Sequence, residues 1–413
     1  MTTTDIFHDP QRYGDMQSWR EEAIALHAEG PIHRIEAKGF PPFWAVIGHD
    51  AVMHVERQPA LFTNEPVPVL TTTEAIAIGE AQGVQIRTLI HMDRPDHTEY
   101  RRLTNDWFKP ASIASMSDRL DVLSAEAIAK LEAAATNGVG TIDFNTEVAL
   151  AYPLQVILSI LGLPEEDYQR MLTLTQEMFG AEDPDLQKGT GSAEDRMATL
   201  LDFYQYFAAL TADRQASPTG DLATLIANGE IYGEPMPDLE KMGYYVIIAS
   251  AGHDTTSATM AEGMAQLARH PDQLELLRND PSLVRNAVEE MLRTSSAVRH
   301  FMRTATEDTE VAGQPIAKGD WLMLNYAAAN MDPTFFTDPM RFDVTRANAD
   351  KHIAFGFGIH FCLGAQLARM ELRSLFGALV PRLASAEIAG EATTSKATFV
   401  SGFKTLPIRY TLT

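Results

Sequence analysis

Near its C-terminal end the chain reads Phe355-Gly356-Phe357-Gly358-Ile359-His360-Phe361-Cys362-Leu363-Gly364. This stretch holds the only cysteine of the 413 residues and three glycines. The residues that follow, 365–373, have the composition of a helix. A thiolate that precedes a helix N-terminus is stabilised by the helix dipole and by unpaired backbone N–H groups. Glycines permit tight turns and let a flat ligand approach the backbone closely.

The chemistry of Cys362 has to be chosen among several kinds of site. A lone cysteine is most often a small buried apolar side chain. Zinc and iron–sulfur sites generally need several cysteines, which this chain does not have. A thiolate held among small residues before a helix suits an axial ligand of haem iron. The residues alone therefore leave two interpretations open, a buried structural cysteine and a haem ligand.

Bulk composition narrows the class of protein. Hydrophobic residues make up 45% of the chain and charged residues 22%, which is ordinary for a soluble globular protein. Length alone suggests two or three domains. A net charge of −23, from 33 basic and 56 acidic side chains, argues against nucleic acid and anionic membranes as partners.

Location is also constrained by the sequence. The N-terminal residues lack a basic region followed by an apolar run, so we expect no signal peptide and no membrane anchor. No apolar run reaches the length of a membrane span. One cysteine excludes an intramolecular disulfide framework and fits the reducing cytoplasm.

The longest helical pattern runs from Asp238 to Ala268 and is apolar on nearly all sides, as in a helix at the centre of a large protein. Its middle nevertheless reads Gly252-His253-Asp254-Thr255. Glycine and threonine are weak helix formers, so we expect a local distortion here. The alternative is two helices broken at Gly252, with Asp254 as the cap of the second.

Periodicity and turn residues predict a mainly helical chain with a minor β region. Residues 65–90 are irregular, which suggests a lid over a pocket, and the stretch 181–191 is polar and loop-like. A strand pair is expected between 311–316 and 321–325, around Lys318-Gly319-Asp320. The remaining expected strands are 32–37 and 43–47, and the expected helices are 16–29, 50–56, 95–108, 118–135, 152–164, 165–179, 194–216, 238–268, 281–293 and 365–379.

Four motifs in the expected order give a family resemblance. The cysteine stretch matches every fixed position of F-G-x-G-x-[RH]-x-C-x-G, and 251–255 match A-G-x-[DE]-T. Glu290 and Arg293 form E-x-x-R, about seventy residues before Cys362, and a Pro-Leu…Leu-Gly-x-Pro pattern begins at Pro153. The chain thus resembles the cytochrome P450 family. The resemblance implies one mainly α domain with a minor β region over residues 1–413 and haem b as cofactor.

The resemblance also implies roles for individual residues. Cys362 would be the proximal ligand of the haem iron, and Asp254 and Thr255 would be catalytic, delivering protons during O2 activation. Glu290 and Arg293 would support the cysteine loop together with Arg341. Arg299 is a nearby competitor of Arg303 among the residues expected at the haem, which are His97, Arg101, Arg303, Phe355, His360 and Gly364.

Substrate and partners follow less directly. The pocket candidates are Ile86, Ile247, Ala251, Ala297, Val298 and Val400, each of which could equally be ordinary core. They suggest a small apolar molecule. Segments 301–304, 325–332 and 401–410 look similar to bacterial P450s that hydroxylate terpineol and related alkyl-aromatic compounds. A steroid or fatty-acid hydroxylase is the alternative, and a haem-binding sensor would have no use for Asp254 and Thr255.

Electrons would come from outside the chain. The sequence carries no flavin or nicotinamide fingerprint and no cysteine set for an iron–sulfur cluster. The resemblance therefore implies a ferredoxin and its reductase as partners. Because the net charge is negative, an acidic ferredoxin would need a local basic patch, for which we expect Arg102, Lys351, Arg369 and Arg373.

Overall fold

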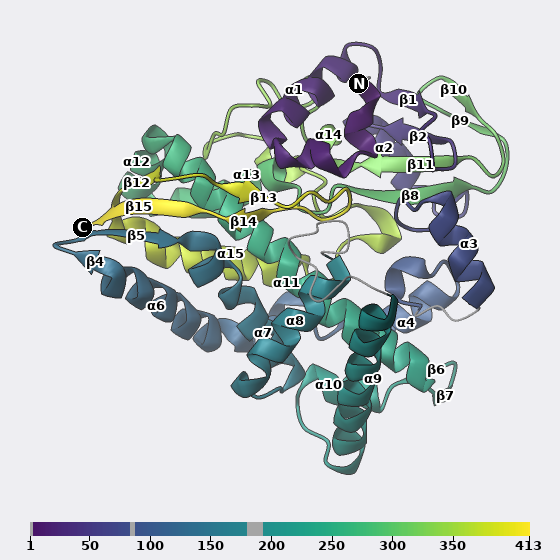
Figure 1. Ribbon diagram of the computed structural model, residues 1–413, viewed down its shortest axis with the longest axis horizontal. Coiled ribbons are helices and arrows are strands. Elements are labelled where there is room, and N and C mark those ends of the chain that lie inside the picture. The colour runs from purple at the N-terminus through teal and green to yellow at the C-terminus, as the bar shows by residue number, and fades with distance from the viewer. Residues whose placement is uncertain (1–2, 83–86, 180–192) are drawn as a thin grey trace.

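In the computed structural model, which describes residues 3–82, 87–179 and 193–413, helices form most of the molecule and strands gather at two sides of it (Figure 1). The mainly α fold with a minor β region is as expected from the sequence. The helices are α1 (Met16–His27), α2 (His49–Glu56), α3 (Thr73–Gln82), α4 (Asp96–Asn105), α5 (Pro110–Ile113), α6 (Ser117–Ala134), α7 (Ala151–Leu161), α8 (Tyr168–Phe179), α9 (Ala193–Ala216), α10 (Leu222–Ala227), α11 (Asp238–Arg269), α12 (Pro271–Asn279), α13 (Val284–Ser295), α14 (Tyr326–Ala329) and α15 (Ala365–Leu379).

The longest helix, α11, crosses the centre of the molecule without interruption (Figure 1). The hydroxyls of Thr255 and Ser257 each donate to the carbonyl four residues earlier, at 2.8 and 3.0 Å, so these polar groups are satisfied inside the helix. A Cβ on Gly252 would lie 2.4 Å from Cδ1 of Ile157 in α7. Gly252 therefore lets two helices pack closely. The alternative of two helices broken at this glycine is wrong, because α11 runs through it.

The first sheet has the strand order β1-β2-β11-β8-β3, with β2 and β11 parallel. The expected pairing of 311–316 with 321–325 is wrong. Ala312 and Gly313 both have positive φ, 51° and 81°, so they close a tight hairpin between β9 and β10, while β11 pairs with β2 and β8. These strands are β1 (Ile32–Ile35), β2 (Phe43–Val46), β3 (Phe62–Thr63), β8 (His300–Ala305), β9 (Thr309–Val311), β10 (Gln314–Ile316) and β11 (Trp321–Asn325).

The second sheet has the order β12-β15-β5-β4 and joins the C-terminal strand to a hairpin far earlier in the chain (Figure 1). Helix α15 packs on α6, α13 and α11. Among the described residues of the irregular region 65–90, α3 is an α-helix and a short 3-10 helix begins at Leu89. Residues 83–86 of this region and the stretch 181–191 lie outside the described part. The remaining strands are β4 (Ala135–Thr136), β5 (Val139–Asp143), β6 (Glu230–Ile231), β7 (Glu234–Pro235), β12 (Leu383–Ile388), β13 (Thr393–Thr394), β14 (Phe403–Thr405) and β15 (Pro407–Leu412).

Candidate active site

The cysteine loop is closed on itself just before α15. The backbone N–H of Cys362 donates to the carbonyl of Phe355 at 2.9 Å. Gly356 and Gly358 have φ values of 64° and 72°, in the left-handed region that favours glycine. A Cβ on Gly358 would also lie 2.4 Å from the carbonyl oxygen of Glu56. Gly356 and Gly358 are therefore required by the backbone path of the loop.

Cys362 is surrounded by protein, and its side chain is nevertheless exposed. Burial raises the pKa of its thiol, whereas the backbone N–H groups of Gly364 and Ala365 and the charge of Arg101 lower it. A Cβ built on Gly364 would meet no atom within 4 Å, so open space continues beside the cysteine. A deep thiol that faces free volume and backbone donors fits an axial thiolate ligand of haem.

Four basic side chains expected at the haem gather beside this loop. The rings of His97 and His360 lie with centroids 4.2 Å apart, and Arg101 donates to the carbonyl of Phe361 at 2.6 Å. Burial, together with the nearby charges of Arg303, His97 and Arg101, lowers the pKa of His360 to about 2. The structure therefore brings His97, Arg101, Arg303 and His360 together.

This basic group has unused hydrogen-bonding capacity. Nε2 of His360 is buried and has no hydrogen-bond partner among the described residues. Arg303 is paired with Glu56 at 2.9 Å, whereas no carboxylate partner is found for Arg101 within the described part of the chain. A partly buried cation without an anion and a buried donor without a partner fit the propionate groups of haem b.

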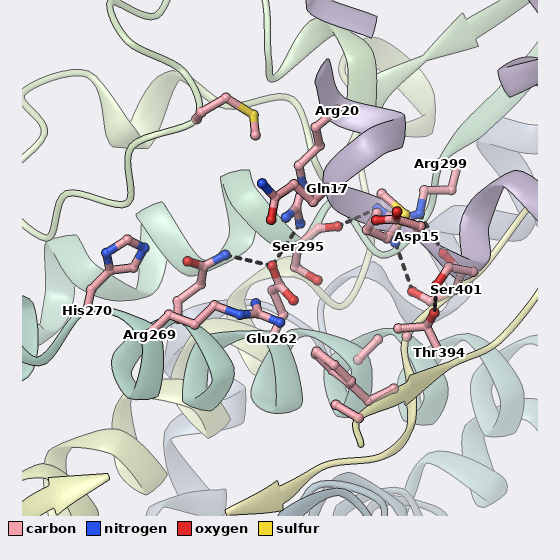
Figure 2. A pocket seen from close by; sticks show the side chains of 18 residues that line it. Asp15, Gln17, Arg20, Glu262, Arg269, His270, Ser295, Arg299, Thr394 and Ser401 are labelled. Atoms are coloured by element: carbon pink, nitrogen blue, oxygen red, sulfur yellow. Dashed lines mark hydrogen bonds and ion pairs between the residues drawn. The ribbon is translucent and has the colours of Figure 1, made fainter. Parts of the chain in front are cut away.

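Arg299 is held elsewhere. Its guanidinium donates to Oγ of Ser401 at 2.8 Å and to the carbonyl of Ser295 at 2.7 Å. It lines a separate polar cavity of about 560 Å³, and Figure 2 shows Arg299 and Ser401 at one side of that cavity, with Arg269 at the other. Of the two competing arginines, Arg303 is therefore the one whose charge acts on His360.

One face of α11 is open although the helix lies in the core. Between Lys241 and Leu267 every residue of α11 is buried except Ile247, Ala251, Gly252, Asp254 and Thr255. Positions 247, 251 and 255 recur every four residues, so they share one face of the helix. Oδ2 of Asp254 is buried and has no hydrogen-bond partner within the described residues. The sequence-predicted catalytic pair and two of the pocket candidates thus border the same partly open strip.

The other pocket candidates do not all lie on α11. Val298 and Val400 form an isolated antiparallel bridge, so they lie side by side although they come from distant segments. Ala297 precedes this bridge and is buried. Ile86 lies outside the residues that the structure describes.

The network that supports the cysteine loop differs from the prediction in one residue. Arg293 donates to both carboxylate oxygens of Glu290 at 2.8 Å, and Glu290 and Arg293 are fully buried. The third member is Arg346, whose Nε donates to the same carboxylate at 3.0 and 3.1 Å. Arg341 is exposed and contributes only its carbonyl oxygen. The assignment of Arg341 is therefore corrected to Arg346.

The basic patch expected for a redox partner is smaller than predicted, because two of its arginines pair with an acid. Glu289 accepts from Nε of Arg369 at 2.9 Å and from Arg373 at 2.8 Å, and His352 lies 3.2 Å away. Burial raises the pKa of Glu289, but hydrogen bonds from His352 and Arg369 outweigh burial and hold it at about 2. Arg369 and Arg373 are therefore internal partners of an acid, while Arg102 stays 70% exposed, beside Glu99.

Sequence reasoning missed Glu56 and Tyr326. The Tyr326 hydroxyl donates to Oε1 of Glu56 at 2.5 Å, while Arg303 holds Oε2. Burial and the adjacent Glu56 raise the pKa of Tyr326. The only available signal was an acid at the end of a short amphipathic helix, which any surface helix can show.

Comparison with known proteins gives a consistent result. The family model described as Cytochrome P450 matches residues 30–411. Cytochrome P450-terp from Pseudomonas sp is 38% identical, covering 97% of this chain and 96% of that protein, and linalool 8-monooxygenase from Pseudomonas putida is 32% identical over 93% of each. The crystal structure of CYP108D1 from Novosphingobium aromaticivorans superposes with a TM-score of 0.90 at 42% identity, covering 100% of this chain and 98% of that one. Within the described residues no helix is long and apolar enough to cross a membrane.

Proposed function

The chain belongs to the cytochrome P450 family, and from that premise we propose that it hydroxylates a small apolar substrate, a monoterpenoid or an alkyl-substituted aromatic compound. Membership of the family makes it a monooxygenase that uses O2 and binds haem b through a cysteine thiolate. The substrate, the electron donor and the roles of individual residues are the parts that are proposed.

Cys362 is assigned as the ligand of the haem iron, beside Phe355 and Gly364. His97, Arg101, Arg303 and His360 would hold the propionates, because they are the buried donors gathered beside the loop. When bound, haem supplies the activation of O2 and the transfer of one oxygen atom, and the thiolate favours this chemistry.

Asp254 and Thr255 are assigned to proton delivery. The Thr255 hydroxyl donates to the carbonyl of Ala251, so its oxygen can accept a hydrogen bond from the pocket side. The buried Oδ2 of Asp254 has no partner in the described structure and can give or take a proton there. Both residues belong to the one open face of an otherwise buried helix.

That open face is the observation that carries the substrate proposal. Ile247 and Ala251 present small or aliphatic side chains next to the catalytic pair, and the Val298–Val400 bridge adds two more apolar side chains of modest size. A compact apolar molecule fits such a lining better than a charged one, because burying an unpaired charge is costly. The name of one relative, linalool 8-monooxygenase, points to a terpenoid of this kind.

A ferredoxin is proposed as the electron donor, in the cytoplasm. Arg101 reaches the carbonyl next to Cys362, and the following residue, Arg102, is exposed on the same helix. A negatively charged partner that docks there would approach the haem from the cysteine side.

The substrate proposal is tested by titrating the ferric holoprotein with terpineol, linalool, p-cymene, lauric acid and cholestenone, and following the spin-state change of the haem. We expect the first three to bind tightest and to give hydroxylated products with a ferredoxin system. Tighter binding and faster turnover of the fatty acid or the steroid would overturn the proposal in favour of that alternative.

Two adjacent isoleucines give a matched control. Ile247→Ala should weaken terpenoid binding up to about tenfold through lost apolar contact, with little change in stability. Ile248→Ala should lower stability instead, because Ile248 is buried and lies about 100° around α11 from Ile247, and should leave the dissociation constant unchanged. Equal effects of both changes on binding would contradict the assigned pocket face.

A further inference from the structure

His253 is enclosed by three hydrogen-bonding groups from three helical segments. Its Nε2 lies 3.0 Å from the carbonyl oxygen of Leu150, at the start of α7. Its Nδ1 lies 3.1 Å from Oδ1 of Asp254 and 3.2 Å from Oγ1 of Thr175 in α8. The His253 side chain is fully buried, whereas that of Asp254 is 17% exposed, so the ring is shielded from water and the carboxyl group is not.

The protons on this ring can be counted from its neighbours. A backbone carbonyl only accepts hydrogen bonds, so Nε2 has to carry a hydrogen that it donates to Leu150. An ionised carboxylate also only accepts, and a neutral ring with Nε2–H presents a bare lone pair at Nδ1. The 3.1 Å contact between Nδ1 of His253 and Oδ1 of Asp254 has the distance of an ion pair, so it is favourable when one of the two groups carries a proton. Without that proton, Nδ1 accepts from the Thr175 hydroxyl instead.

We propose that His253 and Asp254 hold one proton in common and that His253 is the positioning residue that keeps Asp254 ready to donate it. The pair is then either an imidazolium with a carboxylate or a neutral imidazole with a carboxylic acid, and it has no net charge in either form. The proposal deepens the role of Asp254 given above and rests on it.

Thr175 gives the pair a way to release this proton. Its hydroxyl also lies 3.1 Å from the carbonyl of Leu172, so the hydroxyl hydrogen has two possible acceptors. While the shared proton occupies Nδ1 or Oδ1, the hydroxyl donates to Leu172. When the proton leaves through the Asp254 carboxyl group, the lone pair of Nδ1 becomes free and Thr175 turns to donate to it. The net charge of the His253–Asp254 pair falls by one, and a proton taken up from solvent water then returns the pair to its starting state.

The arrangement couples Asp254 to α8. Thr175 belongs to α8, and α8 packs against α11. Loss of the Thr175 hydroxyl would leave Nδ1 without a donor after proton release. The state after donation would then be less stable, although nothing that touches the substrate has changed.

The position of the shared proton can be measured without turnover in the reduced, CO-bound holoprotein. This form is diamagnetic, so it gives sharp nuclear magnetic resonance signals. Nitrogen-15 spectra of histidine-labelled protein, assigned with His253→Gln, should show hydrogen on both ring nitrogens of His253. If Nδ1 carries none, the infrared difference between wild type and Asp254→Asn should show the band of a protonated carboxylic acid. A bare Nδ1 together with no such band would overturn the proposal, as would a bare Nε2.

Turnover measurements on the holoenzyme then show whether His253 positions Asp254 or only packs against its neighbours. His253→Gln keeps a donor for Leu150 and loses Nδ1, whereas His253→Asn keeps a donor for Asp254 but cannot share a proton. Both should lower the product formed per electron pair about threefold or more and change the solvent isotope effect, with substrate affinity unchanged. Thr175→Val should show a smaller loss of the same kind.

If His253→Gln forms as much product per electron pair as the wild type, His253 is only a packing residue and the proposal is overturned. Failure of the underlying role is distinguished by Asp254→Asn. If that variant couples normally while the spectra still show the shared proton, the role of Asp254 in catalysis fails and the proton assignment stands.

Discussion

Arg346 donates from Nε to both carboxylate oxygens of Glu290, at 3.0 and 3.1 Å, while Arg293 holds the same carboxylate at 2.8 Å. The remaining donors of Arg346 reach the carbonyls of Thr337 and Arg341, at 2.7 Å each. One buried acid in α13 thus fixes the segment that leads to the cysteine loop.

Arg346→Ala should lower the free energy of unfolding by about 3–5 kcal/mol, because it removes one partner of a buried ion pair and leaves several carbonyls without donors. Arg341→Ala should change it by less than about 0.5 kcal/mol, since that side chain is exposed. Urea unfolding of both variants measures the difference. A larger loss in Arg341→Ala would mean that the side chain acts in a way the hydrogen bonds do not indicate.

Thr255→Ala should still bind substrate, but more of the electrons should be consumed without product and hydrogen peroxide should be released. The hydroxyl is removed from the open face of α11, where proton delivery is proposed. Ser257→Ala is the matched control, because Ser257 donates to its own helix in the same manner but is buried away from that face. Product formed per NADH consumed is the measurement, and equal coupling in the two variants would rule out the role of Thr255.

Cys362→Ser should fold but lose the thiolate-type absorption of the reduced, CO-bound form and nearly all hydroxylation. No other cysteine exists to replace it. Gln366→Ala, an exposed change in the first turn of α15, should leave the spectrum intact. A thiolate-type spectrum in Cys362→Ser would show that the ligand assignment is wrong.

Arg102→Glu should slow reduction of the substrate-bound protein by ferredoxin severalfold, and the effect should shrink at high salt as charges are screened. Arg382→Glu is the control, because Arg382 is similarly exposed and similarly paired with one glutamate but lies at the far end of α15. Stopped-flow absorbance gives the rates. Identical rates for Arg102→Glu and wild type at low salt would place the docking surface elsewhere.

Glu289 should contribute to acid stability. Its pKa is about 2 in the folded protein against an ordinary value of 4.5, so its stabilisation is present above about pH 5 and is lost as the pH falls toward 2. Glu289→Gln should therefore cost up to about 3 kcal/mol at pH 7, and its difference from wild type should narrow below about pH 4. Urea unfolding across pH tests this, with Glu387→Gln at an exposed pair as control. A difference that does not depend on pH would show that Glu289 acts through packing alone.

The sequence by itself was sufficient for the family, the fold class and the cysteine loop. Gly356 and Gly358 have positive φ, and Gly358 touches a neighbouring backbone, so the spacing of glycines around Cys362 reflects a backbone path that other residues would strain. Local periodicity was enough for α15, which ends at Leu379 as expected. Features of this kind depend on residues close in the chain.

Which side chains pair with one another was decided only by the tertiary structure. Arg341 and Arg346 both follow the same proline in an irregular segment, and only the folded chain shows which guanidinium reaches Glu290. From the sequence, Arg369 is predicted to be a surface charge, but in the structure it donates to Glu289. The sequence likewise does not indicate that His253 contacts Thr175. Hydrogen bonds and ion pairs act over about 3 Å, and the chain brings these groups together from segments tens to hundreds of residues apart, so their pairing has no local pattern from which it could be predicted.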